Sequence, residues 1–458
     1  MNRTHVVSEL KGIVGESYVS DDPVDLLGYT RDFGGEPAHW AEIVVGPSST
    51  EEISEVMKLA NRERVRVTVR GGGSSTSGGC LATLGGIILE TLRMNKITEI
   101  DEDCMTVSVE AGVTFGKLES ELAKKGWMIG VVPEGGLPGT VAANISIPGM
   151  GFFSSAYGCQ GDQVVGLKVV LPSGEVLHTG SQGYPNAKKQ FWRYVFGPDL
   201  SGLFIGSEGT LGIIAEATLK IYRRPAVMGF EKLSFDDLDN AARASHEITQ
   251  KKLAIYNLIT HESFYRAVDP YAKALPKATI DVFIAGTNSE VEERRKSVHE
   301  IAEKHRGILL GGEDSRKYWE NHFIQAGATY KNGVGPMVTY MIPYSRFQEF
   351  TDVMWKVMQR HKIKKCWIGA FDMGNCLEHY NAAFYHEYDQ EEYKKVRDAA
   401  GEMMETALKM GGTPYRIGLQ WAPYVARVLK DTEFFKTTKS LKRLFDPNNI
   451  LNNGVLGI

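Results

Sequence analysis

The chain has 458 residues and a formal net charge of −4, with 43% hydrophobic and 24% charged residues. This composition is typical of a globular protein, whereas a nucleic-acid-binding domain usually shows a basic excess, so we expect no nucleic-acid partner. The length exceeds what one hydrophobic core usually supports, which predicts two domains or one domain with a large insertion.

The cysteines and the apolar segments limit the possible compartments. Five scattered cysteines without C-x-x-C spacing argue against a disulfide framework, an iron–sulfur cluster or a zinc ribbon. The first residues lack the apolar run of a secretory signal, and no apolar stretch approaches the roughly 20 residues that span a bilayer. We therefore expect a cytoplasmic protein with no membrane span.

Residues 46–130 are predicted to contain alternating helices and strands. Ser49 and Glu52 have the spacing of a capping box, and apolar residues follow at helical periodicity, which predicts a helix that begins near Ser49. The alternating residues 65–69 predict a strand. Two further strands are predicted at 85–91 and 105–112, followed by a short helix that Gly126 would close with a left-handed cap.

The stretch V-T-V-R-G-G-G-S-S-T-S-G-G at 67–79 ends with five glycines among nine consecutive residues. Glycine loses more backbone entropy on folding than any other residue, so such a loop needs a reason. One reason is that backbone amides must converge on an anion. The loop lacks the lysine of a Walker loop and the helix and acidic residue of a Rossmann fingerprint. The motif alone leaves both an anion-binding loop and an ordinary turn open.

A second glycine-dense tract extends from Val132 to Gly161. Long irregular segments in a compact domain are usually functional or disordered, and the apolar residues of this tract disfavour disorder, so we expect it to wrap a ligand. A strand pair is predicted at 164–179 with its turn at Ser173-Gly174. Another strand is predicted within 201–221, and Arg223-Arg224-Pro225 indicates a domain boundary.

The composition changes after this boundary. From 226 to 411 glycine becomes rarer and charged helical segments appear, as at 291–305 and 393–410. We interpret these charges as solvated helix faces of a second domain built from a sheet and helices. Residues 412–458 are again rich in small and aromatic residues.

Five blocks in order resemble the flavin-binding domain of the vanillyl-alcohol oxidase and p-cresol methylhydroxylase family of FAD enzymes. The blocks are P-S-S-T-E-E-I at 47–53, V-R-G-G-G-S-S-T-S-G-G at 69–79, V-S-V-E-A-G-V at 107–113, G-D-Q-V-V-G-L-K-V-V-L-P-S-G-E-V at 161–176 and G-S-E-G-T-L-G-I-I at 206–214. The resemblance implies an α+β protein with a PCMH-type FAD-binding domain at 1–225 and an inserted α+β substrate-cap domain at 226–411. The segment 412–458 would return to the FAD domain. Features of this domain are also similar to those of glycolate oxidase subunits and D-lactate dehydrogenases.

The resemblance implies that FAD is the cofactor, with its pyrophosphate wrapped by residues 71–76 and its other parts lined by the second tract and by Ile213 and Ile214. The expected FAD contacts are Arg70, Gly71, Gly72, Gly73, Ser74, Ser75, Thr76, Pro133, Gly135, Gly139, Thr140, Ala143, Asn144, Tyr157, Gly158, Gly209, Ile213 and Ile214. Many members attach FAD through a histidine of the first loop. This loop has none, which excludes attachment there, while a bond from a Tyr or His of the second domain stays possible.

Two branches of this fold differ at the substrate site. The 2-hydroxy-acid branch carries the metal-binding block H-x-G-D-G-N-x-H and a later E-H-G-I-G block, and neither string occurs here. His379 and His386 lie in a strand-like segment that would place them on opposite faces, so we expect no metal. The branch that oxidises para-substituted phenols is similar to this chain at 374–392, at G-G-T-P-Y-R-I-G-L-Q-W (411–421) and at 446–454.

The resemblance to the phenol branch implies three catalytic residues. In that branch a Tyr-Arg pair meets the substrate oxygen and the flavin pyrimidine edge, and Tyr415 and Arg416 take these places here. Such a pair could stabilise a phenolate, from which hydride leaves more readily, by charge-assisted hydrogen bonds. Glu134 falls where phenol oxidisers have an aspartate near flavin N5, so it is either an acid/base group or part of a turn. Ser77 stands where they have a second phenolate-binding tyrosine, which leaves a non-phenolic alcohol or a hydroxy acid open.

These observations predict an FAD-dependent oxidoreductase that oxidises an alcohol or benzylic carbon, with a para-substituted phenol as its first expected substrate. The alternatives are a metal-independent D-2-hydroxy-acid dehydrogenase that uses Arg416 for the carboxylate, and a flavin-binding electron-transfer subunit of a larger complex. The electron acceptor would be oxygen, a cytochrome, a quinone or an electron-transfer flavoprotein. The resemblance also implies a homo-oligomer.

Overall fold

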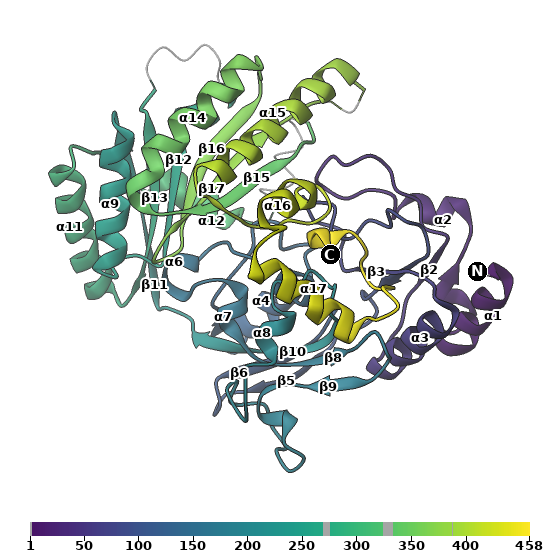
Figure 1. The fold of residues 1–458 in the computed structure, drawn as a ribbon. Coiled ribbons are helices and arrows are strands. Elements are labelled where there is room, and N and C mark those ends of the chain that lie inside the picture. Colours follow the sequence, from purple (N-terminus) through teal and green to yellow (C-terminus); the bar gives the residue numbers. More distant parts are fainter. Residues whose placement is uncertain (1, 269–274, 324–332, 387) are drawn as a thin grey trace.

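A computed structural model describes residues 2–268, 275–323, 333–386 and 388–458, and these ranges form three sheets (Figure 1). Helices alternate with strands along the chain, and both parallel and antiparallel strand pairs occur. The protein therefore contains mixed α and β structure, as predicted. No helix within the described ranges is long and apolar enough to cross a membrane.

The amino-terminal sheet has the strand order β1-β2-β4-β3. Its strands are β1 (Val19–Ser20), β2 (Ile43–Val45), β3 (Val67–Arg70) and β4 (Ile87–Glu90). Both β2 and β3 run parallel to β4. The predicted helix is α3 (Thr50–Glu63), and the Ser49 side chain caps it by accepting the Glu52 amide at 3.1 Å. This helix packs with α1 (Arg3–Val14) and the sheet in one apolar cluster. The first glycine loop leaves the carboxyl end of β3.

The second sheet is antiparallel, with the order β5-β6-β10-β8-β9 and with β7 also pairing with β10. Its strands are β5 (Ile97–Asp101), β6 (Thr106–Glu110), β7 (Trp127–Ile129), β8 (Val164–Val170), β9 (Val176–His178) and β10 (Ile213–Arg223). The predicted turn between β8 and β9 contains Gly174 at a φ of 88°, which glycine adopts without strain. Helix α4 (Phe115–Ala123) ends three residues before Gly126.

The second glycine-dense tract differs from the expected irregular segment. It contains three short helices, α5 (Val141–Ser146), α6 (Ser154–Tyr157) and the start of α7 (Gln160–Gln163). The apolar residues of the tract explain these helices, because Val141, Ile145 and Phe152 are fully buried in the core beside the second sheet. Short helical turns thus anchor the tract, and the glycines between them remain near the protein interior.

The third sheet has the order β14-β11-β13-β12-β16-β17-β15-β18, and all its strands except β18 lie within the predicted cap at 226–411. Its strands are β11 (Val227–Phe235), β12 (Tyr256–His261), β13 (Ala278–Gly286), β14 (Ile308–Gly311), β15 (Met337–Ile342), β16 (Cys366–Asp372), β17 (Leu377–Ala383) and β18 (Thr413–Pro414). Helices α9 (Leu238–Gln250), α11 (Asn288–Lys304), α14 (Phe347–Arg360) and α15 (Gln390–Lys409) accompany this sheet. The predicted boundary at 223–225 begins at Arg223, the last residue of β10, and precedes β11.

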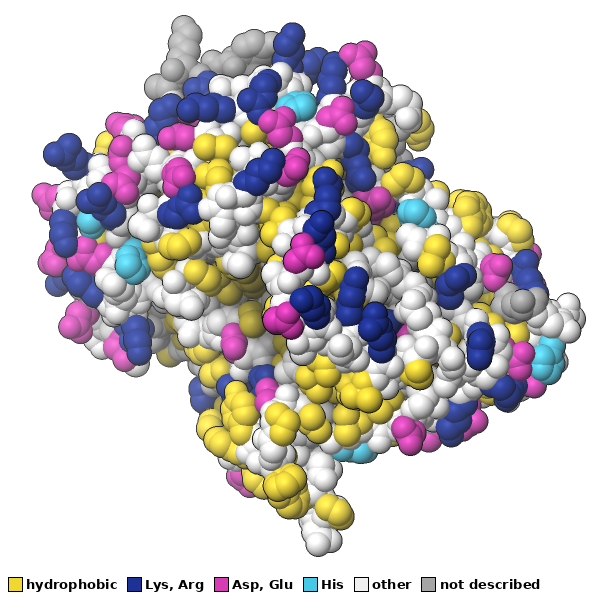
Figure 2. Space-filling view, in the orientation of Figure 1, with side chains coloured by type: hydrophobic (Ala, Val, Ile, Leu, Met, Phe, Trp, Pro, Cys, Tyr) yellow, Lys and Arg dark blue, Asp and Glu magenta, His cyan; other side chains and the backbone are white. Residues whose placement is uncertain are grey.

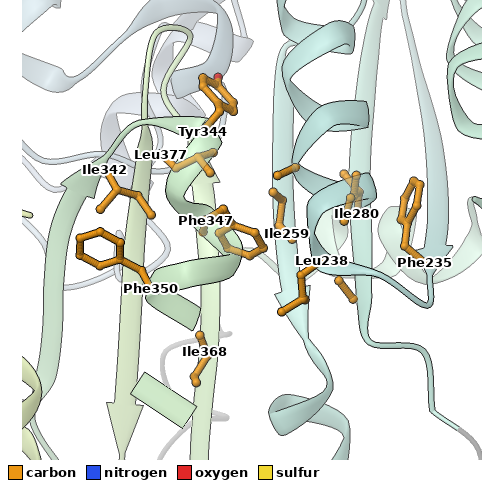
Figure 3. Close-up of a cluster of buried hydrophobic side chains, with 14 of the residues drawn as sticks. Phe235, Leu238, Ile259, Ile280, Ile342, Tyr344, Phe347, Phe350, Ile368 and Leu377 are labelled. Carbon is orange, nitrogen blue, oxygen red and sulfur yellow. The ribbon is translucent and has the colours of Figure 1, made fainter. Parts of the chain in front are cut away.

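Figure 3 shows the core between this sheet and its helices. Ile259, Ile280 and Ile368 from the strands meet Leu238 of α9 and Phe347 of α14, and all five are buried. Because successive side chains of a strand point to opposite faces, their sequence neighbours project to the other face of the sheet. Helices α10 (Glu262–Val268) and α12 (Glu313–Glu320) contact the sheet as well.

The predicted charged segments lie in α11 and α15. Each of these helices buries an apolar stripe, and most of its charged residues are exposed. Figure 2 shows positive and negative side chains interspersed over the helical part of the molecule, without a large patch of one sign on this face. This distribution agrees with solvated helix faces.

The carboxyl-terminal segment connects the third sheet to the first. After β18 the chain forms α16 (Ala422–Leu429) and α17 (Glu433–Phe445). Leu451 then forms a parallel bridge with Val67 of β3, with the Val67 amide donating to Ile450 at 2.7 Å. The start of the first glycine loop is therefore held by residues almost 400 positions later in the chain.

Candidate active site

A cavity of about 850 Å³ lies between the two glycine-rich segments and the third sheet. Its lining includes residues 71–76 of the first loop, residues of the second tract such as Pro133 and Thr140, and Gly209, Ile213 and Ile214 beside β10. The opposite wall comes from β11, β12, β13, β16 and β17, together with Arg416 of the carboxyl-terminal segment. The cavity thus joins all three predicted segments of the chain.

The glycines of the first loop allow two backbones to touch. A Cβ at Gly72 would lie 1.6 Å from the carbonyl oxygen of Pro138, and one at Gly71 would lie 2.4 Å from Oγ1 of Thr140. Side chains are therefore excluded here, and the bare loop packs directly on the second tract. Among the described residues, Oγ1 of Thr140 and Oδ1 of Asn144 are buried without a hydrogen-bond partner. Backbone amides and the Thr140 hydroxyl can donate to the phosphate oxygens of a ligand such as a dinucleotide, and Oδ1 of Asn144 can accept a hydrogen bond from another part of it.

All the predicted FAD contacts line this cavity except Arg70, Tyr157 and Gly158. Arg70 points away from it: its guanidinium donates to the carbonyl of Arg31 at 3.1 Å, and a Cβ at Gly73 would lie 2.3 Å from its Nη2. Arg70 therefore supports the loop on the side that faces away from the cavity.

The other two residues lie on the outer side of the second tract. The ring of Tyr157 packs on Tyr222 with centroids 4.3 Å apart. The amide of Gly158 donates to the carbonyl of Ser154 at 2.9 Å, which ends α6. Packing against β10 thus turns Tyr157 away from the cavity, which differs from its predicted contact with FAD.

Tyr415 and Arg416 are adjacent in sequence but face different surroundings. Arg416 has a φ of 56° and lines the cavity, where its Nη2 lies 3.8 Å from Oε1 of Glu378. Its Nε is buried and has no hydrogen-bond partner among the described residues. Tyr415 is buried behind this wall, and its hydroxyl accepts the backbone amide of Met150 at 3.1 Å. The described cavity lining includes Arg416 and not Tyr415, but the guanidinium carbon lies 4.8 Å from the centroid of the Tyr415 ring, so the structure keeps the predicted pair in contact.

Glu208 holds the turn that follows Arg416. Its carboxylate accepts the amides of Ile417 at 2.9 Å and Gly418 at 2.8 Å. Burial raises the pKa of Glu208 to about 7, although these two amides favour the ionised form. The side chain of Asn452 donates to the Glu208 carbonyl at 2.8 Å and accepts the Val69 amide at 2.8 Å. One polar network thus connects the Arg416 turn to the strand that carries the first glycine loop.

Two further carboxyl groups lie near Arg416. Burial raises the pKa of Glu134, opposed by a hydrogen bond from the Tyr318 hydroxyl and by the charge of Arg416. Burial also raises the pKa of Glu378 to about 7, with Arg416 opposing this shift and Glu134 adding to it. Burial disfavours the charge of Arg416, but Tyr415 and Glu378 raise its pKa above the ordinary value, so it remains a cation. A carboxyl group with a pKa near neutrality can exchange protons at physiological pH.

One row of cross-strand neighbours forms the floor of the cavity on the third sheet. The row is Lys232, Asp281, Leu258, Phe371 and Glu378, on β11, β13, β12, β16 and β17 respectively. Residues directly opposite one another project to the same face, and all five line the cavity. Neighbouring strands lie about 4.8 Å apart, so four steps separate Lys232 from Glu378 by roughly 19 Å across the sheet.

Aromatic side chains make up much of the remaining cap wall. They are Phe264, Tyr265, Trp367, Phe371, Tyr380 and Phe384. Trp367 lies between Phe264 and Phe384, with ring centroids 5.1 Å and 4.8 Å away. Apolar pockets with a few convergent polar groups are typical small-molecule sites.

Comparison with known families identifies the protein. Residues 41–180 match the family described as FAD binding domain, and residues 224–456 match the family described as FAD linked oxidases, C-terminal domain. The second match covers 233 of the 458 residues. The chain belongs to the FAD-linked oxidases. Its cofactor is FAD, and the predicted family and cofactor are confirmed.

Two relatives match the FAD-linked oxidase over nearly its whole length. Glycolate oxidase subunit GlcD of Bacillus subtilis is 27% identical, and the match covers 98% of this chain and 96% of that protein. The mitochondrial D-lactate dehydrogenase [cytochrome] of Arabidopsis thaliana is also 27% identical, over 98% of this chain and 80% of that protein. This chain is therefore an oxidoreductase that acts on CH–OH or CH₂ groups, as predicted.

Solved structures confirm the predicted fold of the FAD-linked oxidase. p-Cresol methylhydroxylase with substrate bound has a TM-score of 0.89 at 20% identity, over 99% of this chain and 96% of that chain. 4-Ethylphenol oxidase from Gulosibacter chungangensis has a TM-score of 0.85 at 19% identity, over 99% and 97% of the two chains. At this identity the likeness concerns the fold, which is the predicted PCMH-type α+β architecture.

No histidine is among the described residues that line the cavity of the FAD-linked oxidase. His379 is fully buried on the helix side of β17, stacked on Tyr340 and bonded to Thr351 at 3.0 Å, and burial lowers its pKa to about 3. His386 lies beyond the end of β17 and is exposed. In the part of the chain that the structure describes, no group of three or more His, Cys, Asp or Glu side chains is placed to hold a metal ion.

Several cavity residues of the FAD-linked oxidase are absent from the sequence-based set. Glu378 and Tyr380 flank His379, and the alternation that turns His379 toward the helices turns both of them toward the cavity. That signal was available in the sequence. Glu208, Lys232 and Tyr318 carried no comparable signal, because the cavity draws them from separate elements.

Proposed function

We propose that this FAD-linked oxidase removes hydride from the benzylic or carbinol carbon of a para-substituted phenol. The main observation in support of this proposal is the position of Arg416. This residue is a cation in the cavity wall, and its buried Nε has no hydrogen-bond partner among the described residues. The wall around it is largely aromatic, which suits an aryl ring, and the guanidinium suits a phenolate oxygen.

The residues around Arg416 fit the proton and charge movements of this reaction. Glu378 in its ionised form accepts the proton of the phenol oxygen, and Arg416 stabilises the phenolate that results. The benzylic carbon then loses hydride with its electron pair, and the substrate becomes a para-quinone methide. FAD, when bound, supplies the two-electron acceptor for this hydride.

Glu134 is the second carboxyl group of the proposed site. Its hydrogen bond from the Tyr318 hydroxyl restricts its orientation, and burial favours its protonated form. Arg416 opposes the rise in the pKa of Glu134, as it opposes that of Glu378, so the guanidinium interacts with both carboxyl groups. Its unpartnered Nε can donate to an anionic substrate oxygen.

A second candidate is a D-2-hydroxy-acid dehydrogenase. The relatives from Bacillus subtilis and Arabidopsis thaliana, a glycolate oxidase subunit and a D-lactate dehydrogenase, favour it. Arg416 would then hold the substrate carboxylate through its planar pair of N–H donors. Both candidates place an anion on Arg416 and differ in the carbon that is oxidised.

The test is the flavin absorbance of the purified holoenzyme under argon. Addition of 4-ethylphenol is expected to bleach the flavin band, while 4-ethylanisole, which has the same ring but no ionisable proton, leaves it unchanged. D-lactate and D-2-hydroxyglutarate are added to separate samples. Bleaching by a hydroxy acid alone contradicts the phenol proposal and supports the second candidate.

A further inference from the structure

Besides Arg416 and Lys317, which is exposed and pairs with Glu313, the cavity is lined by a buried cation, Lys232, at the opposite end of the cap floor. Lys232 and Glu378 end the row of cross-strand neighbours, with Leu258 and Phe371 between them. Their side chains line one cavity, so an elongated ligand at Arg416 can also reach Lys232. The two ends are polar and the middle is apolar.

The contacts of Lys232 leave donor capacity toward the cavity. Its Nζ lies 3.4 Å from Oδ1 of Asp281 and 5.9 Å from the ring centroid of Tyr265. Oδ1 of Asp281 also accepts the Ser315 hydroxyl at 2.6 Å, so it is shared between two donors. An ammonium group can donate three hydrogen bonds, and no other ion-pair partner of Lys232 occurs among the described residues.

A contribution to folding stability does not by itself explain why Lys232 and Asp281 form a buried ion pair. Only 15% of the Lys232 side chain and 7% of the Asp281 side chain are exposed. A buried ion pair can often be replaced by apolar residues without loss of stability, because desolvation of the charges offsets their attraction. A partly desolvated ammonium group that faces an aromatic cavity is instead suited to an incoming acceptor.

We propose that Lys232, positioned by Asp281, is a second recognition site that binds a carboxylate at the remote end of the substrate. The inference rests on the proposed function, because the substrate then is a phenol whose para substituent ends in a carboxylate. Arg416 holds the phenol oxygen, Leu258 and Phe371 contact the apolar middle, and Lys232 binds the far end.

The first test measures binding alone and does not depend on oxidation. Calorimetry compares 5-phenylpentanoate with 5-phenylpentanamide on the holoenzyme, since this pair differs only in the charge of the remote group. We expect the wild-type protein to bind the acid about tenfold more tightly, and Lys232→Met to bind both alike. Equal affinities of the wild-type protein for the acid and the amide would overturn the proposal. A preference for the acid that persists in Lys232→Met would also overturn it, because another cation would then bind the carboxylate.

The matched control is Lys168→Met. Lys168 forms the same kind of cross-strand pair with Glu216, at 3.3 Å, but both lie outside the described cavity lining. The preference for the acid is expected to remain in this variant, and its loss would contradict a specific role of Lys232. Asp281→Asn is a second variant. It keeps a side-chain oxygen that can position Lys232 but removes the negative charge that competes with the substrate carboxylate. The acid is therefore expected to bind several-fold more tightly, and unchanged or weaker binding counts against the site.

The second test separates this inference from the proposed function. Anaerobic flavin bleaching is followed with 5-(4-hydroxyphenyl)pentanoate and its amide. If neither phenol bleaches the flavin while Lys232→Met still abolishes the binding preference, the carboxylate site stands and the phenol reaction is wrong. If both phenols bleach it equally well and the binding preference is absent, the reaction stands and the carboxylate site is wrong.

Discussion

Nη2 of Arg416 lies 3.8 Å from Oε1 of Glu378, while Nε of the arginine and Oε2 of the glutamate have no hydrogen-bond partner among the described residues. The pair is close enough for strong attraction but leaves one polar atom on each side unused. Buried polar atoms are rarely left without partners, so this pair is suited to a ligand that contacts both groups. The proposed phenol oxygen, which gives its proton to the carboxylate and its charge to the guanidinium, has this property.

Replacement of Arg416 by alanine is expected to lower kcat/KM for 4-ethylphenol by about 100- to 1000-fold, as for removal of a charged group that stabilises a developing anion. Anaerobic rapid mixing with the phenol measures the rate of flavin bleaching. Arg295→Ala is a matched control, because Arg295 also pairs with a buried carboxylate, Glu231, but lies on α11 outside the described cavity lining. An unchanged rate in Arg416→Ala contradicts its role in binding the substrate anion.

The pH dependence of the reaction is expected to follow Glu378. Because its pKa is about 7, its ionised form is lost as the pH falls below neutrality, and the bleaching rate should fall with it. Glu378→Gln removes the proton acceptor and should abolish this limb of the profile as well as slowing the reaction. A wild-type profile that is flat between pH 5.5 and 8.5 would exclude Glu378 as the acceptor.

Glu378 should also affect stability in a pH-dependent way. Its pKa rises from 4.5 to about 7 on folding, so the folded state holds a proton that the unfolded state has released between these values. The free energy of unfolding should therefore decrease as the pH rises from about 4.5 to 7, by about 3 kcal/mol for this group. Thermal unfolding of Glu378→Gln should show a weaker decrease over the same interval. An equally steep decrease in the variant assigns the effect to other groups.

Removal of the Glu208 carboxylate is expected to destabilise the Arg416 turn. Glu208→Ala leaves the amides of Ile417 and Gly418 without their acceptor, which should cost about 2–3 kcal/mol in the free energy of unfolding. The KM for the phenol should rise as Arg416 loses its fixed position. Glu208→Gln retains one acceptor oxygen and should show a smaller loss in both measurements. Unchanged stability and KM in Glu208→Ala would mean that the carboxylate does not hold this turn.

The close packing at Gly72 predicts a loss of cofactor. Gly72→Ala places a Cβ 1.6 Å from the carbonyl oxygen of Pro138, so the two glycine-rich segments must separate. The purified variant should contain much less FAD, measured as the ratio of absorbance at 450 nm to that at 280 nm. Gly12→Ala on α1 is the control, because its Cβ meets no atom within 4 Å, and it should keep full FAD content. Full FAD content in Gly72→Ala would contradict the assigned role of the loop.

Features that depend on neighbouring residues were predictable from the sequence. The cap of Ser49 on α3 and the Gly174 turn are local, since their hydrogen bonds and backbone angles involve residues a few positions apart. The glycines of the first loop likewise indicate an anion site, because only bare backbone can present several amides together. The five ordered sequence blocks that resemble the flavin-binding domain are local evidence of the same kind, and they were sufficient to predict the fold and the cofactor.

Features that depend on distant strands were not predictable in this way. Lys232 and Glu378 share a cavity only because five strands pair in one register, and a shift of one residue would turn either side chain toward the helices. Arg416 lines the cavity, whereas the Tyr415 hydroxyl bonds to Met150 and the Tyr157 ring packs on Tyr222. These orientations depend on the elements that pack against each residue. The sequence by itself therefore determined the family, the fold and the cofactor through local patterns. Only the tertiary structure decided which side chains meet the substrate, because their arrangement depends on packing between segments that are distant in the sequence.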